Sequence, residues 1–222
     1  MSNIIVLGIA GGSGSGKSTF AERIRDGLSC SCEIMRLDCY YFDQGGKPFE
    51  ERTKVNYDSP KIFDFDEMLA DIRLLLDGKP VTRKGYNYVE HRRDDSEELM
   101  YPPEVLIIEG IHVFYDDRIC DAMNLKLFIK VDSDICLLRR IARDMNERGR
   151  SLESISEQYK ATVKPMREKY IDRYIDKADV VVMRGGMNEQ ALKTTISYLK
   201  SCVKEQRLAE SEKNESDGND SE

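Results

Sequence analysis

The sequence predicts an α/β fold in which a central parallel sheet carries helices on both faces. Several short apolar runs lack polar alternation, which is typical of strands buried on both sides. Segments with helical apolar spacing lie between these runs, an alternation that favours parallel βαβ units. The first run ends in a glycine-rich turn that leads directly into a helix.

The expected elements follow one another along the 222-residue chain. Strands are expected at residues 4–9, 33–37, 105–108, 125–131 and 179–183. Helices are expected at 17–28, 65–76, 134–147, 152–169 and 188–208. The fourth helix should break or kink before Pro165, because a proline ring removes a helical hydrogen bond and clashes with the preceding turn.

Three regions depart from this alternation. Residues 81–101 predict a small β-hairpin insertion that stands off the main sheet, with short strands at 85–89 and 99–101 and a charged stretch at 91–98. Residues 134–170 form the expected helical lid region of a domain that spans 1–208. Residues 209–222 are polar and acidic, and we expect a disordered tail there because they cannot bury enough apolar surface.

The charge of the chain is concentrated at its end. Residues 205–222 carry seven acids and two basic residues, a net of −5, which leaves −2 of the total −7 for residues 1–204. A nearly neutral domain does not indicate a nucleic-acid partner. Six cysteines without a C-x-x-C pair argue against a zinc site. With no signal-like start and no apolar run of membrane length, we expect a cytoplasmic protein with free thiols and no membrane partner.

Residues 11–18 match the phosphate-binding motif G-x-x-x-x-G-K-[ST] in full, between an expected strand and helix. The glycines let backbone N–H groups turn toward phosphates at the positive end of the helix. Lys17 would meet the β- and γ-phosphates, and the Ser18 hydroxyl would bind Mg²⁺. The motif predicts a P-loop NTPase fold whose nucleotide site includes Gly11, Gly12, Ser13, Gly14, Ser15, Gly16, Lys17, Ser18 and Thr19.

Two acids follow expected strands of the sheet. Asp38 follows the second and Glu109 the third, so both should lie at the carboxyl edge, where open α/β sheets bind ligands. Asp38 could accept the proton of an attacking hydroxyl, or it could simply cap a turn. Glu109 has the usual position of an acid that holds Mg²⁺ or its water shell, and the alternative is a solvent-facing strand end.

Five arginines fall within twelve residues: Arg139, Arg140, Arg143, Arg148 and Arg150. They would repel one another unless an anion joined them. A lid that closes over a triphosphate would supply that anion and exclude water. The alternative is an exposed helix whose arginines pair with Asp144 and Glu147.

Together these motifs resemble the uridine kinase (uridine–cytidine kinase) family, most closely its bacterial members, over about residues 4–199. Asp38–Tyr41 is similar to D-x-[FY]-Y, residues 56–60 to N-[FY]-D-x-P, and residues 86–91 to Y-x-[FY]-x-x-H. Ile108–Ile111, the arginine segments 139–144 and 147–150, and Gln158 complete the resemblance.

The resemblance implies a Mg²⁺-dependent enzyme of pyrimidine salvage that phosphorylates the ribose 5′-hydroxyl of uridine or cytidine with ATP or GTP. It also implies a homotetramer. Asp38 would be the catalytic base, assisted by Lys17, Arg143 and Arg148. Arg140, Arg143 and Arg148 would bind nucleotide. The acceptor would contact Asp38, Tyr41, Tyr57, Asp58, Tyr86, His91, Arg93, Arg140, Arg150 and Gln158.

Two alternatives remain open at this point. One is a kinase of the same architecture with another hydroxyl acceptor, similar to phosphoribulokinase or pantothenate kinase. The other is a nucleotide-binding regulator without turnover. The absence of N-K-x-D and L-S-G-G-Q sequences argues against a guanine-nucleotide switch and a transport ATPase. His112 matches none of the motifs, and we interpret it as structural.

Overall fold

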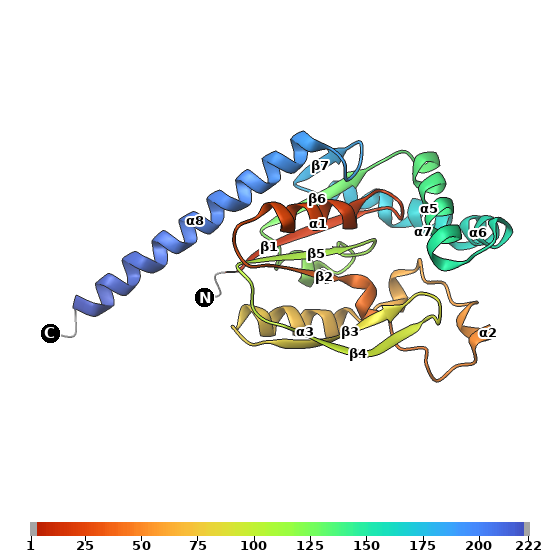
Figure 1. The fold of residues 1–222 in the computed structure, drawn as a ribbon, viewed down its shortest axis with the longest axis horizontal. Helices are drawn as coiled ribbons and strands as arrows, with labels where there is room; N and C mark the ends of the chain where they lie inside the picture. Colours follow the sequence, from red (N-terminus) through yellow and green to blue (C-terminus); the bar gives the residue numbers. More distant parts are fainter. Residues whose placement is uncertain (1–3, 220–222) are drawn as a thin grey trace.

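A five-stranded sheet in the order β2-β5-β1-β6-β7 forms the centre of the protein (Figure 1). All four strand pairs are parallel, which confirms the predicted fold class. The computed structural model describes residues 4–219, and of Asp95 and residues 213–219 it describes the backbone alone. The strands are β1 (Ile5–Gly11), β2 (Cys32–Arg36), β5 (Val105–Gly110), β6 (Leu125–Lys130) and β7 (Val180–Met183).

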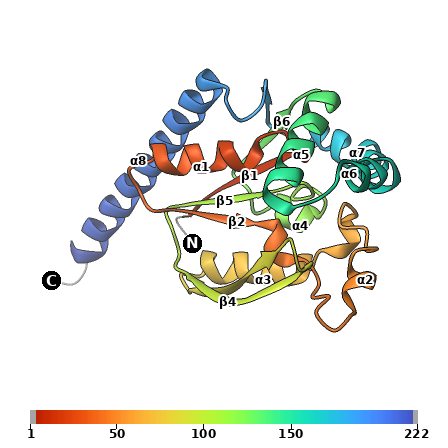
Figure 2. The same cartoon turned by 45° about the vertical axis from the view of Figure 1, so that its right-hand side comes forward.

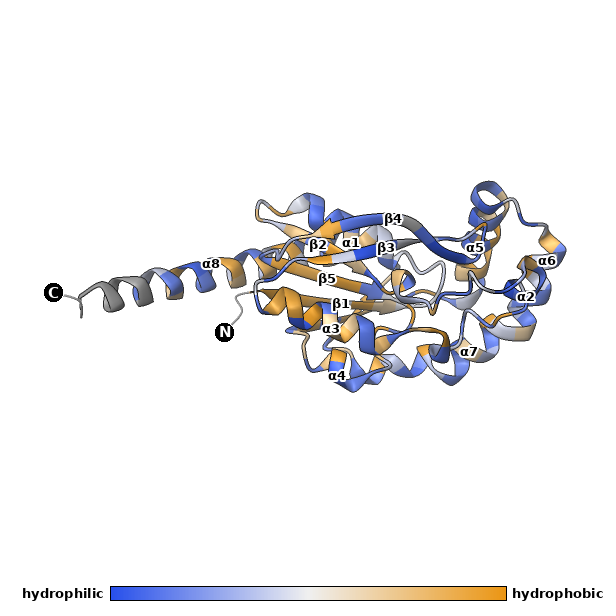
Figure 3. Ribbon diagram, turned by 90° about the horizontal axis from the view of Figure 1, so that it is seen from below, coloured by the Kyte–Doolittle hydropathy of each residue, from blue (hydrophilic) through white to orange (hydrophobic). Residues whose placement is uncertain are grey.

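Helices cover both faces of this sheet (Figures 1 and 2). One face packs against α1 (Lys17–Gly27) and α8 (Glu189–Asn219). The other packs against α3 (Phe65–Leu76), α4 (Asp117–Cys120) and the 3-10 segment η4 (Ile171–Lys177). Successive residues of a strand enter opposite layers, so both faces must be apolar, and Figure 3 shows the central strands as the hydrophobic interior.

The hairpin insertion consists of β3 (Val81–Asn87) and β4 (Arg92–Met100), which pair antiparallel beside α3. The charged stretch 91–98 is therefore most of the second strand and not the hairpin loop, so the expected strand limits were wrong. A two-stranded ribbon leaves much of its surface in water, and charges can pair across it. Arg83 Nη2 lies 2.9 Å from Glu98 Oε2, and Lys84 Nζ lies 3.9 Å from Glu97 Oε1.

The lid region surrounds the carboxyl ends of the strands, at the right of Figure 1. It contains α5 (Ser133–Arg148), α6 (Leu152–Gln158), the π-helical turn η3 (Tyr159–Val163) and α7 (Lys164–Lys169). The expected break before Pro165 takes the form of the π turn, since the proline cannot donate a regular helical hydrogen bond. Three short turns lie nearby: η1 (Leu37–Tyr40), α2 (Phe49–Arg52) and η2 (Pro60–Ile62).

Helix α8 continues past its expected end at Leu208 to Asn219, so residues 209–219 are helical where we expected disorder. Residues 220–222 lie outside the described residues. Extending an established helix adds one hydrogen bond per residue, whereas starting one is unfavourable, and Arg207 Nε anchors this helix at 2.8 Å from Glu104 Oε1. Within residues 4–219, no helix has the sustained apolar character that crossing a bilayer requires.

The central strand β5 generates a stability prediction. Ile107 is fully buried between β1 and β2, so Ile107→Ala should leave a cavity and lower the free energy of unfolding by about 3 kcal/mol. Urea denaturation measures the change. Ile135→Ala is the control, because the Ile135 side chain on α5 is 39% exposed. This substitution should lower the free energy of unfolding by less than about 1 kcal/mol. Equal losses in both variants would contradict the prediction.

Candidate active site

The glycine-rich loop joins β1 to α1 in a conformation that only glycine accepts at two positions. Gly14 and Gly16 have φ values of 83° and 89°, in the left-handed region. A Cβ on Gly14 would also lie 2.3 Å from the carbonyl oxygen of Cys136. The Ser15 amide donates to the Gly12 carbonyl over 3.0 Å and closes the turn. The loop therefore has the curled backbone that the motif predicted.

Polar atoms of this loop face a space suited to an anion. Among the described residues, the buried Ser15 Oγ has no hydrogen-bond partner, an arrangement that a bound phosphate would relieve. Arg143 Nη2 lies 3.4 Å from Ser13 Oγ, so the arginine segment reaches the loop. The loop also rests against the turn after β7: a Cβ on Gly186 would lie 2.1 Å from the Gly16 carbonyl oxygen. The only sign of this contact in the sequence is the Gly185–Gly186 pair.

Ser18 and Glu109 meet directly beside the loop. The Ser18 hydroxyl donates to Glu109 Oε1 over 3.0 Å, and Arg36 Nε lies 3.6 Å from the same oxygen. Burial raises the pKa of the Glu109 carboxyl, and the nearby charge of Lys17 opposes this. Two hard oxygen ligands at the start of α1 fit Mg²⁺, which typically takes its other ligands from phosphates and water.

Asp38 lies in η1, directly after β2, at the carboxyl edge where it was expected. The Tyr88 hydroxyl donates to Asp38 Oδ2 over 2.6 Å. The Arg148 guanidinium covers the Tyr88 ring at 4.2 Å from its centroid. The sequence analysis gave Tyr88 no role, although it is the middle aromatic residue of the motif at 86–91.

Aromatic side chains pack against one another beside Asp38. The ring of Tyr41 lies 4.6 Å from that of Tyr86, and the ring of Tyr57 stacks on His91 at 5.1 Å. Burial lowers the pKa of His91, and the charge of Arg150 lowers it further, so the imidazole is neutral at pH 7. A cavity of about 510 Å³ opens here, a size suited to a small ligand, with Tyr88, His91, Arg148, Arg150, Gln158 and Thr162 among its lining residues.

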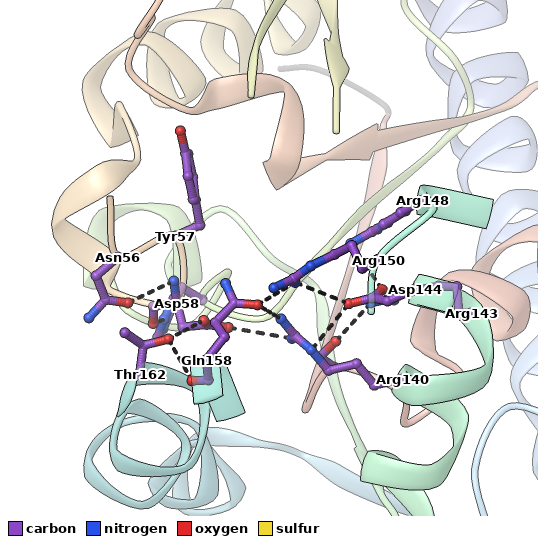
Figure 4. A network of polar contacts seen from close by, with 12 residues as sticks. Asn56, Tyr57, Asp58, Arg140, Arg143, Asp144, Arg148, Arg150, Gln158 and Thr162 are labelled. Atoms are coloured by element: carbon purple, nitrogen blue, oxygen red, sulfur yellow. Dashed lines mark hydrogen bonds and ion pairs between the residues drawn. The ribbon is translucent and has the colours of Figure 1, made fainter. Parts of the chain in front are cut away.

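Asp58 contacts Thr162, one of the residues that line this cavity (Figure 4). Burial raises the pKa of its carboxyl, while Arg140 and Thr162 oppose the shift. The Thr162 hydroxyl donates to Asp58 Oδ2 over 3.0 Å, and Arg140 Nη1 lies 3.7 Å from Oδ1. Thr162 was missed because nothing in the sequence connects it to Asp58.

The buried His112 side chain contacts the backbone of Asp58. His112 Nε2 lies 2.8 Å from the Asp58 carbonyl oxygen and must carry the proton, because a carbonyl only accepts. The other ring nitrogen then accepts from the Tyr174 hydroxyl at 2.8 Å. Burial lowers the pKa of His112 to about 4. These contacts agree with the interpretation of His112 as a structural residue, and they connect it to the backbone of Asp58.

The arginine segment surrounds one fully buried carboxylate, that of Asp144 (Figure 4). Four guanidinium groups lie 2.8–3.6 Å from its oxygens: those of Arg140, Arg143, Arg148 and Arg150. Gln158 Oε1 accepts from Arg140 over 2.9 Å and from Arg150 over 2.5 Å. Asp144 is thus not on a solvent-facing surface. Because Arg140 also pairs with Asp58, the four arginines keep an excess of two positive charges over these two carboxylates.

Arg93 lies away from this cavity. Its Nε donates to the Tyr41 carbonyl over 2.8 Å, and its Nη1 donates to Glu67 Oε1 over 2.8 Å. These contacts tie β4 to α3 and to the segment after η1. The Arg93 guanidinium therefore reaches the backbone of one expected acceptor residue, Tyr41, but it does not line the cavity.

These elements define a P-loop phosphotransferase: a phosphate-binding loop, a candidate Mg²⁺ pair, a carboxylate at the sheet edge and a cavity for an acceptor. The chain belongs to the Phosphoribulokinase / Uridine kinase family, whose profile matches residues 6–191. This confirms the resemblance drawn from the motifs.

Similar proteins agree with this membership. The chain is 41% identical to the uridine kinase of Ligilactobacillus salivarius over 201 residues, which cover 90% of this chain and 94% of that protein. It is 38% identical to the uridine kinase of Bacillus subtilis over 207 residues, 93% and 98% of the two chains. The phosphoribulokinase structure from Rhodobacter spheroides has the same fold, with a TM-score of 0.62 at 13% identity over 82% of this chain and 70% of that one.

The buried carboxylate of Asp144 generates a second stability prediction. Asp144→Asn keeps the shape but leaves four guanidinium groups without their shared anion, so the free energy of unfolding should fall by about 3 kcal/mol. Urea denaturation at pH 7 measures it. Glu147→Gln on the same helix is the matched control, since Glu147 is exposed and should change stability by less than about 0.5 kcal/mol. A similar small effect in both variants would refute the prediction.

His112 generates a pH dependence. Its pKa is about 4 in the folded protein and about 6.5 when unfolded, so the unfolded state binds the extra proton first. The protein should therefore keep the full stability contribution above pH 6.5 and lose up to about 3 kcal/mol as pH falls from 6.5 to 4. Urea denaturation should show a stability loss between pH 7 and pH 5 that is about 2 kcal/mol smaller in His112→Gln. Identical losses would exclude His112 as the cause.

Proposed function

We propose that this enzyme transfers the γ-phosphoryl group of ATP or GTP to the ribose 5′-hydroxyl of uridine or cytidine, producing UMP or CMP for pyrimidine salvage. The observation that supports the proposal is the position of Asp38, which follows β2 at the carboxyl edge of the sheet and accepts a hydrogen bond from Tyr88, a residue of the cavity wall. The names of the bacterial relatives, uridine kinases at about 40% identity, support the same acceptor.

The donor side binds the triphosphate by charge and backbone geometry. The loop amides and Lys17 contact the β- and γ-phosphates, and Arg143 extends from α5 to the loop. Ser18 and Glu109 would hold Mg²⁺, which would offset the charge that develops on the phosphate oxygens. Arg140 and Arg148 add positive charge around the transferred group, and water is excluded as the lid region closes.

The acceptor side binds the nucleoside through Asp58 and through the aromatic residues Tyr57, Tyr86 and His91. The Asp58 carboxylate accepts hydrogen bonds from the ribose 2′- and 3′-hydroxyls, so a deoxyribose would leave a buried acceptor unpaired. Tyr57 and Tyr86 contact the flat base. Neutral His91 can donate to a carbonyl or accept from an amino group, which accommodates both uracil and cytosine.

Transfer itself requires a base near the 5′-hydroxyl. Asp38 accepts the hydroxyl proton as the oxygen attacks the γ-phosphorus. Arg150 and Gln158 position the acceptor from the lid side, where Gln158 already joins Arg140 to Arg150. Tyr41 packs behind the pocket, and Arg93 contributes by fixing the Tyr41 segment and not by direct contact. The active form is a cytoplasmic homotetramer.

A panel of acceptors tests the function directly. Uridine, cytidine, their 2′-deoxy forms, ribulose 5-phosphate and pantothenate are each assayed with ATP and with GTP for release of nucleoside diphosphate. We expect turnover with uridine and cytidine and a large loss with the deoxy forms. Preferential turnover of ribulose 5-phosphate or pantothenate would show a different acceptor, and no turnover with any of them would reject the kinase function.

The base assignment is tested by Asp38→Asn. The amide keeps the size of the side chain but cannot take the proton, so kcat should fall by about 10³ while nucleotide affinity changes little. Steady-state kinetics with uridine and nucleotide titration measure the two quantities. Asp43→Asn, an exposed aspartate shortly after η1, is the control and should retain activity. A kcat near that of the parent would remove Asp38 from this role.

A further inference from the structure

We propose that the Tyr88 hydroxyl blocks Asp38 through its hydrogen bond and so prevents hydrolysis of the nucleoside triphosphate until an acceptor displaces it. We call this hydrogen bond the latch. The inference rests on the proposed role of Asp38 as the base. It assigns Tyr88 a part in selecting the acceptor nucleoside over water.

The latch follows from the geometry of a single hydrogen bond. The Tyr88 hydroxyl lies 2.6 Å from Asp38 Oδ2 and donates to it. An acceptor hydroxyl is a donor of the same kind and competes for the same carboxylate. Burial and the charge of Asp38 raise the pKa of Tyr88 well above its usual value, so the phenol stays protonated. Tyr88 thus occupies the place on the base that a reacting hydroxyl must take.

The side chain is held in a way that permits release. Tyr88 directly follows β3, at the tip of the hairpin, and remains 36% exposed. The centroid of its ring lies 4.2 Å from Arg148 Cζ and 5.2 Å from the centroid of the Tyr86 ring, which it meets in a T-shaped arrangement. The side chain also forms part of the wall of the acceptor cavity. A nucleoside that fills this cavity gains contacts with its walls and can displace the phenol, whereas a water molecule gains no such contacts.

Arg148 connects the latch to the donor side. Its Nη1 lies 3.3 Å from Asp144 Oδ1 while its guanidinium covers the Tyr88 ring. A triphosphate in the arginine cluster competes for that guanidinium. Donor binding therefore loosens the contact that holds the ring, and acceptor binding completes the release.

The reaction that the latch suppresses is nucleoside triphosphate hydrolysis. Without Tyr88 on Asp38, a water oxygen can attack the γ-phosphorus while Asp38 takes one proton of that water. The bond from the γ-phosphorus to the β,γ-bridging oxygen then breaks. The products are a nucleoside diphosphate and inorganic phosphate, with the proton passing from Asp38 to solvent.

The test is Tyr88→Phe in the full-length protein, which removes the hydroxyl and keeps the ring for Arg148. Phosphate release from ATP is measured without acceptor, and UMP formation is measured with uridine. We expect the ratio of hydrolysis to transfer to rise at least about tenfold, and the uridine KM to fall because no phenol competes for Asp38. Tyr101→Phe is the control, since Tyr101 is 65% exposed after β4, and it should leave the ratio unchanged.

Tyr88→Phe combined with Asp38→Asn separates the explanations. If the latch acts through Asp38, the double variant loses the extra hydrolysis. A ratio unchanged in Tyr88→Phe, or extra hydrolysis that persists in the double variant, would overturn the latch. If the parent enzyme does not phosphorylate uridine but Tyr88→Phe gains Asp38-dependent hydrolysis, the latch stands and the proposed acceptor is wrong.

Discussion

The position of β1 between β5 and β6 is the constraint on which the site depends. All strands of the main sheet are parallel, so their carboxyl ends bring the glycine-rich loop, Glu109 and Asp38 to one edge. The register pairs Glu109 with Ile9 on one side and with Arg36 on the other. A slip of one residue in β5 would turn the Glu109 side chain to the opposite face, away from Ser18. The two apolar layers that bury β5 prevent that slip, so the hydrophobic core holds the catalytic edge in register.

The concentration of positive charge near the loop sets a second requirement. A phosphate site needs several guanidinium groups close together, yet burying them without a counter-ion is costly. Asp144 resolves this conflict by pairing with four arginines while leaving an excess of positive charge. The same network reaches Asp58 through Arg140 and, through Gln158, links α5 to α6. The proposed donor and acceptor sites are therefore connected through charged side chains.

The acceptor side is built from segments outside the sheet. The hairpin contributes Tyr86, Tyr88 and His91, and the lid contributes Gln158 and Thr162. Two of them contact carboxylates that lie outside the hairpin and the lid: Tyr88 contacts Asp38, and Thr162 contacts Asp58. Because these contacts are made by single side chains and not by packed layers, incoming ligands can replace them. The rigid half of the site thus lies on the sheet and the adaptable half on the insertions.

The sequence by itself determined the parallel α/β fold, the phosphate-binding loop and the edge positions of Asp38 and Glu109, because these depend on spacing within short segments. Contacts between distant segments were decided only by tertiary structure. Nothing local indicates that Tyr88 bonds to Asp38, or that His112 supports Asp58. Arg93 was expected to contact the acceptor, but in the tertiary structure its guanidinium pairs with Glu67. The charged residues of β4 and of the end of α8 led to wrong predictions of the strand limits and of disorder. A two-stranded ribbon and an anchored helix both tolerate charged residues that a buried strand would not.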